Sequence, residues 1–254
     1  MHYEIRAMSI GEIVDTSFRV LRNHFVPLVG ISAIVNVPVA MGQALVQAEA
    51  EAGAAASLPT LAVGLGFVSF ALVSPIVSAA VTAMIGEVYL GREAKIGQSF
   101  RVAIEILLPL IGTSLLAGLG VMFGTLLFII PGIWLGLGLI ALTPVMVVER
   151  SFGMAAIRRS LDLLSGNRGR AFLLYLLVVI LASILGGVFG LLAGVAPIFG
   201  GLASSLASSV TGAFLAVVSV SLYFEIRSRK EAFEIEQLAR LVGGTSGPAS
   251  AGTL

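Results

Sequence analysis

The chain has 254 residues, of which 57% are hydrophobic and only 11% are charged, and its mean hydropathy is +1.05. A soluble domain carries about 25% charged residues, so this composition excludes a mainly water-exposed surface and indicates an integral membrane protein. Cysteine is absent, which excludes a disulfide framework, a thiolate nucleophile and a cysteine metal site.

The first part of the chain predicts a surface helix followed by two membrane spans. Ser9, with Glu12 three residues later, has the pattern of a capping box, and an amphipathic helix is predicted for residues 9–23. Two uncharged runs follow, each with room for one membrane-spanning helix. They predict spans at about residues 25–47 and 61–86.

The middle of the chain repeats this order. A surface helix is predicted at about residues 93–103, followed by an uncharged run of 43 residues, Ile106–Val148. As one helix this run would be about 65 Å long, twice the hydrocarbon thickness, so it must turn. Pro131-Gly132 is the predicted turn, because Pro suits a first helical turn and Gly tolerates a tight reversal. The two spans are then predicted at about 104–128 and 131–148.

The last part predicts a third unit of the same kind. A surface helix at about residues 151–165 leads into an uncharged run long enough for two spans, at about 170–194 and 200–224. A closing amphipathic helix is predicted at about 226–242. The Gly/Ser/Thr-rich residues 243–254 are predicted to be disordered.

The basic residues predict the orientation. All 15 Lys and Arg residues fall on the same side of the six predicted spans, and the three opposite loops contain only Glu49 and Glu51 as charged residues. Because cytoplasmic loops carry the excess of Lys and Arg, both termini are predicted to be cytoplasmic. Trp134 then lies just after an outer turn, where its ring suits the membrane interface. Residues 1–242 are thus predicted to form one all-α domain of six transmembrane helices, arranged as three hairpins that each follow a cytoplasmic surface helix.

An internal repeat supports this division. With an offset of 82 residues, positions 17–30 align without gaps with positions 99–112 and share seven of fourteen residues. The match includes Ser-Phe-Arg-Val at both starts and a Pro-Leu pair further on. In both copies an amphipathic stretch leads into a span through a proline, as expected for duplicated units.

Several motifs of the second half together resemble a known family. They are Pro131-Gly132-Ile133-Trp134, Thr143-Pro144, Ala155-Ala156-Ile157-Arg158-Arg159-Ser160 and the segment LYFEIRSRKEAFE at 222–234. The series resembles the bacterial family called the glycerophosphoryl diester phosphodiesterase membrane domain, over about residues 9–241. The resemblance implies a multi-pass protein of the bacterial inner membrane with no assigned activity. It implies the membrane part alone, because the soluble enzyme of some relatives needs a barrel of about 250 residues.

Residues for catalysis are scarce. His2 and His24 are the only histidines, and Asp15 and Asp162, both in predicted surface helices, are the only aspartates. A Ser–His dyad or an aspartyl pair at membrane depth is therefore excluded, and no metal-protease or phosphate-loop motif occurs. We expect a non-catalytic protein without a metal or a cofactor.

The remaining candidates are binding residues. Arg158, Arg159, Arg168 and Arg170 could bind anionic lipid phosphates. Cytoplasmic ion pairs are expected between Glu149 and Arg158 or Arg159, and at helical spacing between Glu225 and Arg229, Arg227 and Glu231, and Lys230 and Glu234. Uncharged polar residues at membrane depth could line a polar path: Asn36, Gln43, Ser204 and Ser208, with Ser74 and Thr82 among others.

Two functions remain open at this point. The first is a protein that binds or organises lipid, or scaffolds envelope partners, through its surface helices. The alternative is a transporter or channel for a small or amphipathic substrate, which needs a hydrated path through the spans. Expected partners are membrane lipids and either a second copy of the chain or another membrane protein, but not nucleic acid. A continuous polar cavity would favour transport. A dry core packed at glycines would favour the first function.

Overall fold

The computed structural model describes residues 8–51, 64, 74–89, 95–195 and 197–243, and the regular structure among them is entirely helical. The helices are α1 (Ile10–Asn23), α2 (Phe25–Glu51), α4 (Ser74–Tyr89), α5 (Ile96–Glu105), α6 (Leu107–Leu127), α7 (Ile129–Gly138), α8 (Leu142–Val148), α9 (Gly153–Leu164), α10 (Arg168–Val195) and α11 (Pro197–Gly243). The predicted disordered tail lies outside the described residues, apart from Gly243 at the end of α11.

Four segments are long and apolar enough to cross a membrane. They are Leu107–Leu127, Ile129–Val148, Arg168–Val188 and Ser205–Lys230. A fifth is obtained if α1 and the start of α2, bent by 80° at their junction, are counted as one broken span. The helix α4 is apolar but has only 16 residues; it overlaps the second half of the predicted span 61–86, of which residues 61–63 and 65–73 lie outside the described residues. The protein is therefore a helical membrane protein with four or five candidate spans among the described residues.

Helices α1, α5 and α9 occupy the first three positions predicted for surface helices, and they share a repeated feature. Helix α1 begins with the predicted capping box, in which Ser9 and Glu12 bond each other's backbone N–H. Each of α1, α5 and α9 buries one serine, and in all three units the following membrane helix starts eight residues later. The serine and helix-start pairs are Ser17 with Phe25, Ser99 with Leu107, and Ser160 with Arg168. The third unit thus shares this feature of the repeat, although it follows the second after 61 residues and not 82.

The turn of the second unit differs from the prediction. It falls at Phe128, and Pro131 lies in the first turn of α7. Gly132, the second residue of the predicted turn, serves helix packing and not the turn, because a Cβ there would lie 2.5 Å from the backbone nitrogen of Thr125 on α6. The close approach of α6 and α7 at Gly124 and Gly132 therefore places the reversal three residues earlier than the Pro-Gly pair.

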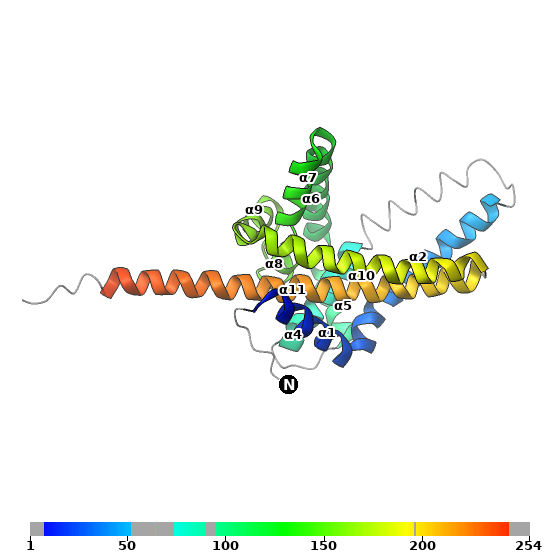
Figure 1. Ribbon diagram of the computed structural model, residues 1–254, viewed down its shortest axis with the longest axis horizontal. Coiled ribbons are helices and arrows are strands. Elements are labelled where there is room, and N and C mark those ends of the chain that lie inside the picture. The colour runs from blue at the N-terminus through cyan, green and yellow to red at the C-terminus, as the bar shows by residue number, and fades with distance from the viewer. Residues whose placement is uncertain (1–7, 52–63, 65–73, 90–94, 196, 244–254) are drawn as a thin grey trace, which may run out of the picture.

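The helices do not form a parallel bundle. Helices α10 and α11 lie side by side, whereas the α6–α7 hairpin lies crosswise to them (Figure 1). The predicted break between residues 224 and 226 is wrong, because α11 continues for 47 residues without interruption. No Gly or Pro occurs between Phe224 and Glu231, so nothing in the sequence there stops a helix.

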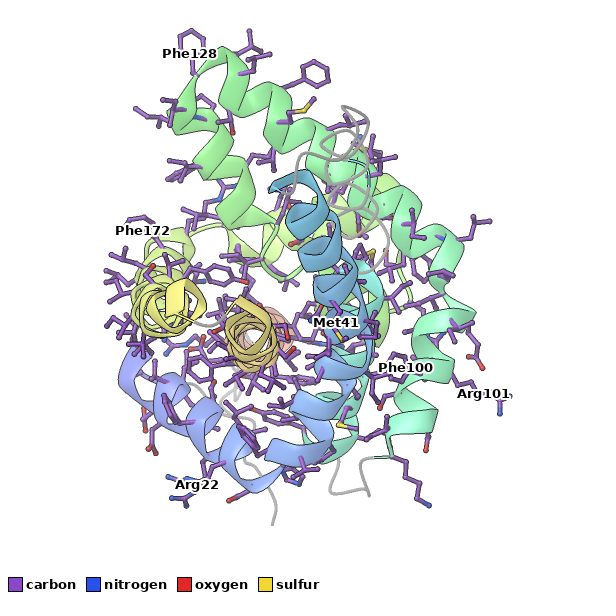
Figure 2. All side chains as sticks on the ribbon, turned by 90° about the vertical axis from the view of Figure 1, so that its right-hand side faces the viewer. Arg22, Met41, Phe100, Arg101, Phe128 and Phe172 are labelled. Atoms are coloured by element: carbon purple, nitrogen blue, oxygen red, sulfur yellow. The ribbon has the colours of Figure 1, made fainter. Side chains whose placement is uncertain are left out.

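Helix α11 is the central element of the fold. It packs against α1, α2, α4, α9 and α10, and its side chains Val217, Val218, Leu222 and Tyr223 are buried. Large apolar side chains are exposed on α6, α7 and α10, including Phe172 and, at the tip of the hairpin, Phe128 (Figure 2). Apolar surfaces of this size are typical of contact with lipid or with another membrane protein.

Candidate functional site

A polar cavity lies inside the bundle, between α2, α4, α7, α8, α10 and α11. Its volume is about 390 Å³. Eight side chains with a hydroxyl or amide group line it: Ser32, Asn36, Ser74, Ser78, Thr82, Thr143, Tyr175 and Ser219. No Lys, Arg, Asp or Glu is part of this lining. The cavity can therefore accept hydrogen-bonding groups without placing a protein charge beside them.

Helix α4 supplies the main polar wall. Ser74, Ser78 and Thr82 follow one another at a spacing of four residues, so they lie on one face of the helix. Thr82 is 1% exposed, whereas Ser74 at the other end is exposed. Gly86 continues the same stripe towards the end of α4. A single face of α4 thus runs from an exposed end into the interior.

A second cavity adjoins the first on the side of α6. It has a volume of about 620 Å³ and shares Ser74, Ser78 and Thr143 with the central cavity. The rest of its lining is mainly apolar and includes Leu119 and Met122, which are 40% and 52% exposed. This apolar groove therefore connects the polar cavity to the lipid-facing surface of α6.

A third cavity continues in the opposite direction along α4. It has a volume of about 300 Å³, shares Thr82 with the central cavity, and includes Gly86 of the same stripe. Its charged lining residues are Glu87, Lys95 and Arg150. Three adjoining cavities along α4 thus change from apolar through polar to charged.

The opposite wall of the central cavity is fixed by a hydrogen bond between α10 and α11. The hydroxyl of Ser219 donates to the Leu215 carbonyl at 2.9 Å, so the Tyr175 hydroxyl, 2.7 Å away, donates to Ser219. This bond leaves the phenol oxygen able to accept from a ligand. Both side chains line the cavity, so the wall presents acceptors to it.

Beyond the cavities, Glu149 joins three helices. It follows α8 and accepts hydrogen bonds from Arg159 of α9 at 3.0 and 3.3 Å and from the Tyr223 hydroxyl of α11 at 2.8 Å. Arg227 donates to Tyr223 at 2.8 Å and lies 3.8 Å from the Glu149 carboxylate. Burial alone would raise the pKa of Glu149, but these hydrogen bonds and positive charges hold that pKa below its ordinary value of 4.5.

A second charged cluster lies further along α11. The side chain of Glu225 is fully buried and pairs with Arg170 of α10 at 3.1 Å and with Arg229 one turn later. Both arginines also donate to the Met8 carbonyl, at 2.6 and 3.1 Å. Lys230 donates to the Asp162 carbonyl at the end of α9 and to the hydroxyl of Ser165. The two clusters fasten α11 to α8, α9, α10 and the segment before α1.

The four arginines predicted to bind lipid phosphate have different surroundings. Arg159 and Arg170 are engaged by the buried clusters, whereas Arg158 is exposed. The guanidinium of Arg168 lies 4.6 Å from the centre of the Trp134 ring. Trp134, which was predicted to lie just after an outer turn, is therefore beside the start of α10. The crosswise α6–α7 hairpin is the cause, because it brings α7 against α10.

The other predicted residues divide in a similar way. The expected pairs Glu149–Arg159 and Glu225–Arg229 are present, and Arg227 contacts Tyr223 and Glu149. Of the predicted polar path, Asn36 lines the central cavity, and Ser208 is exposed and does not. The side chains of Gln43, Ser204, Glu231 and Glu234 lie outside the described part of the chain.

The fold and its cavities define a helical membrane protein with an internal polar site. Among the described residues no group of three His, Cys, Asp or Glu side chains could hold a metal ion. A scan against family models, a search of curated proteins and a search of solved structures each returned no match.

Proposed function

We propose that this chain is a non-catalytic inner-membrane protein that binds an amphipathic lipid along α4. The observation that carries the proposal is the shared lining of the central cavity and the apolar groove. Ser74, Ser78 and Thr143 belong to both, so one ligand can place its polar part among hydroxyl groups and its apolar part towards α6. Ligand sites typically combine an apolar wall with a few polar groups in this way.

The lining chemistry also limits the ligand class. Hydroxyl and amide groups donate and accept hydrogen bonds but carry no charge, so they suit the glycerol or ester region of a lipid. A charged headgroup would instead lie towards Glu87, Lys95 and Arg150 in the third cavity. The order of the three cavities follows the order of chain, backbone and headgroup in a lipid molecule.

Lipid retention tests this proposal. Ser78→Phe places a ring at the junction of the central cavity and the groove, whereas Ser208→Phe makes the same change at an exposed position of α11. Native mass spectrometry of the purified proteins would compare the lipid that each retains. We expect Ser78→Phe to lose most of the retained lipid and Ser208→Phe to keep it. Equal retention by both folded variants would refute the site along α4.

Transport of the lipid or of a small amphipathic molecule is the second candidate. Its support is Thr82, which lines both the central cavity and the charged cavity, so the route continues beyond the hydroxyl-lined part. Liposomes that contain the protein and a fluorescent phospholipid would test it, with dithionite to bleach the outer leaflet. Transport predicts complete bleaching with the normal protein and partial bleaching with Ser78→Phe. Binding alone predicts that about half of the signal remains with both.

We also propose the six-span topology, with cytoplasmic termini, in a bacterial inner membrane. The support is the location of all 15 basic residues on one side of the predicted spans and the resemblance of residues 9–241 to the membrane-domain family. Because the chain lacks cysteine, single reporters can be introduced without background. An impermeant maleimide should label Ser57→Cys in intact spheroplasts but Ser246→Cys only after lysis. The reverse pattern would overturn the orientation.

A further inference from the structure

A separate apolar groove lies between the surface helix α1 and the α10–α11 pair. Its volume is about 410 Å³, within the range of about 300–1,000 Å³ that ligand pockets usually have. The apolar lining comes from these three helices and from Phe25 at the start of α2: Phe18, Leu21, Phe25, Val178, Leu181, Ala182, Val210 and Phe214. It has no residue in common with the three cavities along α4.

One cation completes this groove. Arg22, in the last turn of α1, belongs to the lining and is exposed (Figure 2). It has no ion-pair partner among the described residues, whereas Arg19, one turn earlier, pairs with Asp15 at 2.6 Å. The charge of Arg22 is therefore available at the end of an apolar groove, while that of Arg19 is already balanced.

We infer that this groove binds an anionic phospholipid, with an acyl chain along the apolar wall and the phosphate at Arg22. Phe18 of α1 and Phe214 of α11 make an edge-to-face contact, with ring centres 5.0 Å apart, that joins the two sides of the wall. A groove so lined excludes water but accepts hydrocarbon. A guanidinium binds a phosphate through two donors, and a net negative headgroup adds attraction that the ammonium of a zwitterionic headgroup would partly cancel.

The amphipathic character of α1 supports the same occupant. The helix has an acidic and basic face opposite Ile13, Val20 and Leu21, which are buried against the bundle. Such a helix lies at the level of lipid headgroups. Arg22 is then at the depth of the phosphates, and the groove below it is at the depth of the chains.

Two matched arginine variants test the inference. Arg22→Gln and Arg19→Gln remove the same charge from the same helix, but only Arg22 lines the groove. Binding of phosphatidylglycerol and of phosphatidylcholine with identical chains would be measured by native mass spectrometry of the delipidated protein. We expect Arg22→Gln to weaken phosphatidylglycerol binding about five-fold, as one lost arginine–lipid contact predicts, and to change phosphatidylcholine binding little. Arg19→Gln should bind both lipids as the normal protein does.

Two further variants keep the result interpretable. Ala182→Phe fills the groove and should weaken the binding of both lipids. Arg22→Lys keeps the charge and should retain most of the preference for phosphatidylglycerol. Equal losses in Arg22→Gln and Arg19→Gln would overturn the inference, because they would show a general effect of surface charge. So would an unchanged preference in Arg22→Gln. Ser78→Phe affects only the α4 cavities, so the groove and the proposed function can fail independently.

Discussion

Removal of one hydroxyl group tests how α11 is held. Tyr223 is 1% exposed, and its hydroxyl donates to Glu149 and accepts from Arg227, both at 2.8 Å. Tyr223→Phe deletes both hydrogen bonds but keeps the ring and its edge-to-face contact with Phe224, at 5.2 Å between centres. Hydrogen bonds to charged groups contribute about 1.5–3 kcal/mol. Because Glu149 keeps its pair with Arg159, we expect the free energy of unfolding to fall by an amount near the lower limit, about 1.5–2 kcal/mol.

The matched control is Tyr175→Phe. It removes a hydroxyl whose only hydrogen-bond partner among the described residues is the neutral Ser219. The free energy of unfolding should therefore fall by about 0.5–1.5 kcal/mol. Unfolding by sodium dodecyl sulfate in mixed micelles, followed by circular dichroism, measures both free energies. A smaller loss for Tyr223→Phe than for Tyr175→Phe would refute the view that the Glu149 cluster holds α11 in place.

Three further changes have defined outcomes. Gly132→Ala forces a methyl group against Thr125, so thermal unfolding in detergent should show a free energy of unfolding that is about 1–3 kcal/mol lower. In the control Gly112→Ala, the new methyl group meets nothing within 4 Å and should not destabilise the protein. Because the pKa of Glu149 is lowered on folding, its stabilisation is complete above the ordinary value of 4.5 and is lost as pH falls through the folded pKa. The difference in melting temperature between the normal protein and Glu149→Gln should therefore vanish in acid. Arg168→Gln removes the guanidinium over the only tryptophan, Trp134, and should change its emission spectrum; an identical spectrum would contradict the stacking.

Local signals predicted helices at the positions of α1, α5 and α9. The Ser9–Glu12 pattern is a contact between neighbours in sequence, so it could be recognised without the fold. The repeat in positions 17–30 and 99–112 also corresponds to a real structural unit, because both copies change helix at the same aligned position. Amphipathic periodicity predicted helices near α5 and α9 for the same reason.

Packing decided what the sequence could not. Pro131-Gly132 has the composition of a turn, but the contact of Gly132 with α6 is a tertiary feature that composition does not encode. The sequence placed Trp134 after a turn but could not reveal its contact with Arg168, because that contact depends on how α7 packs against α10. The sequence changes from apolar to charged residues after Phe224, and this change suggested two separate helices. The change affects which surroundings the side chains prefer, but it does not interrupt the helix.

The cavity was only partly visible in the sequence. Asn36, Ser74 and Thr82 stood out as polar residues in apolar runs, and all three line it. Their spacing contained a further signal, since Ser78 completes a four-residue stripe on α4. Tyr175 gave no signal, because its position near the start of a span equally suits the membrane interface.

The distribution of charge distinguishes the polar face of α4, which lines the cavities, from the charged clusters of α11. A buried charge without a partner costs several kcal/mol, so Glu149 and Glu225 require arginine partners, and these pairs hold α11 against its neighbours. Neutral hydroxyl groups can instead bond to the carbonyl one turn earlier in their own helix when no ligand is present, as Ser219 does. A wall built from such groups can gain and lose a polar ligand without leaving a charge unpaired. The polar stripe of α4 therefore suits reversible binding, and the charged clusters of α11 supply the fixed frame against which that binding takes place.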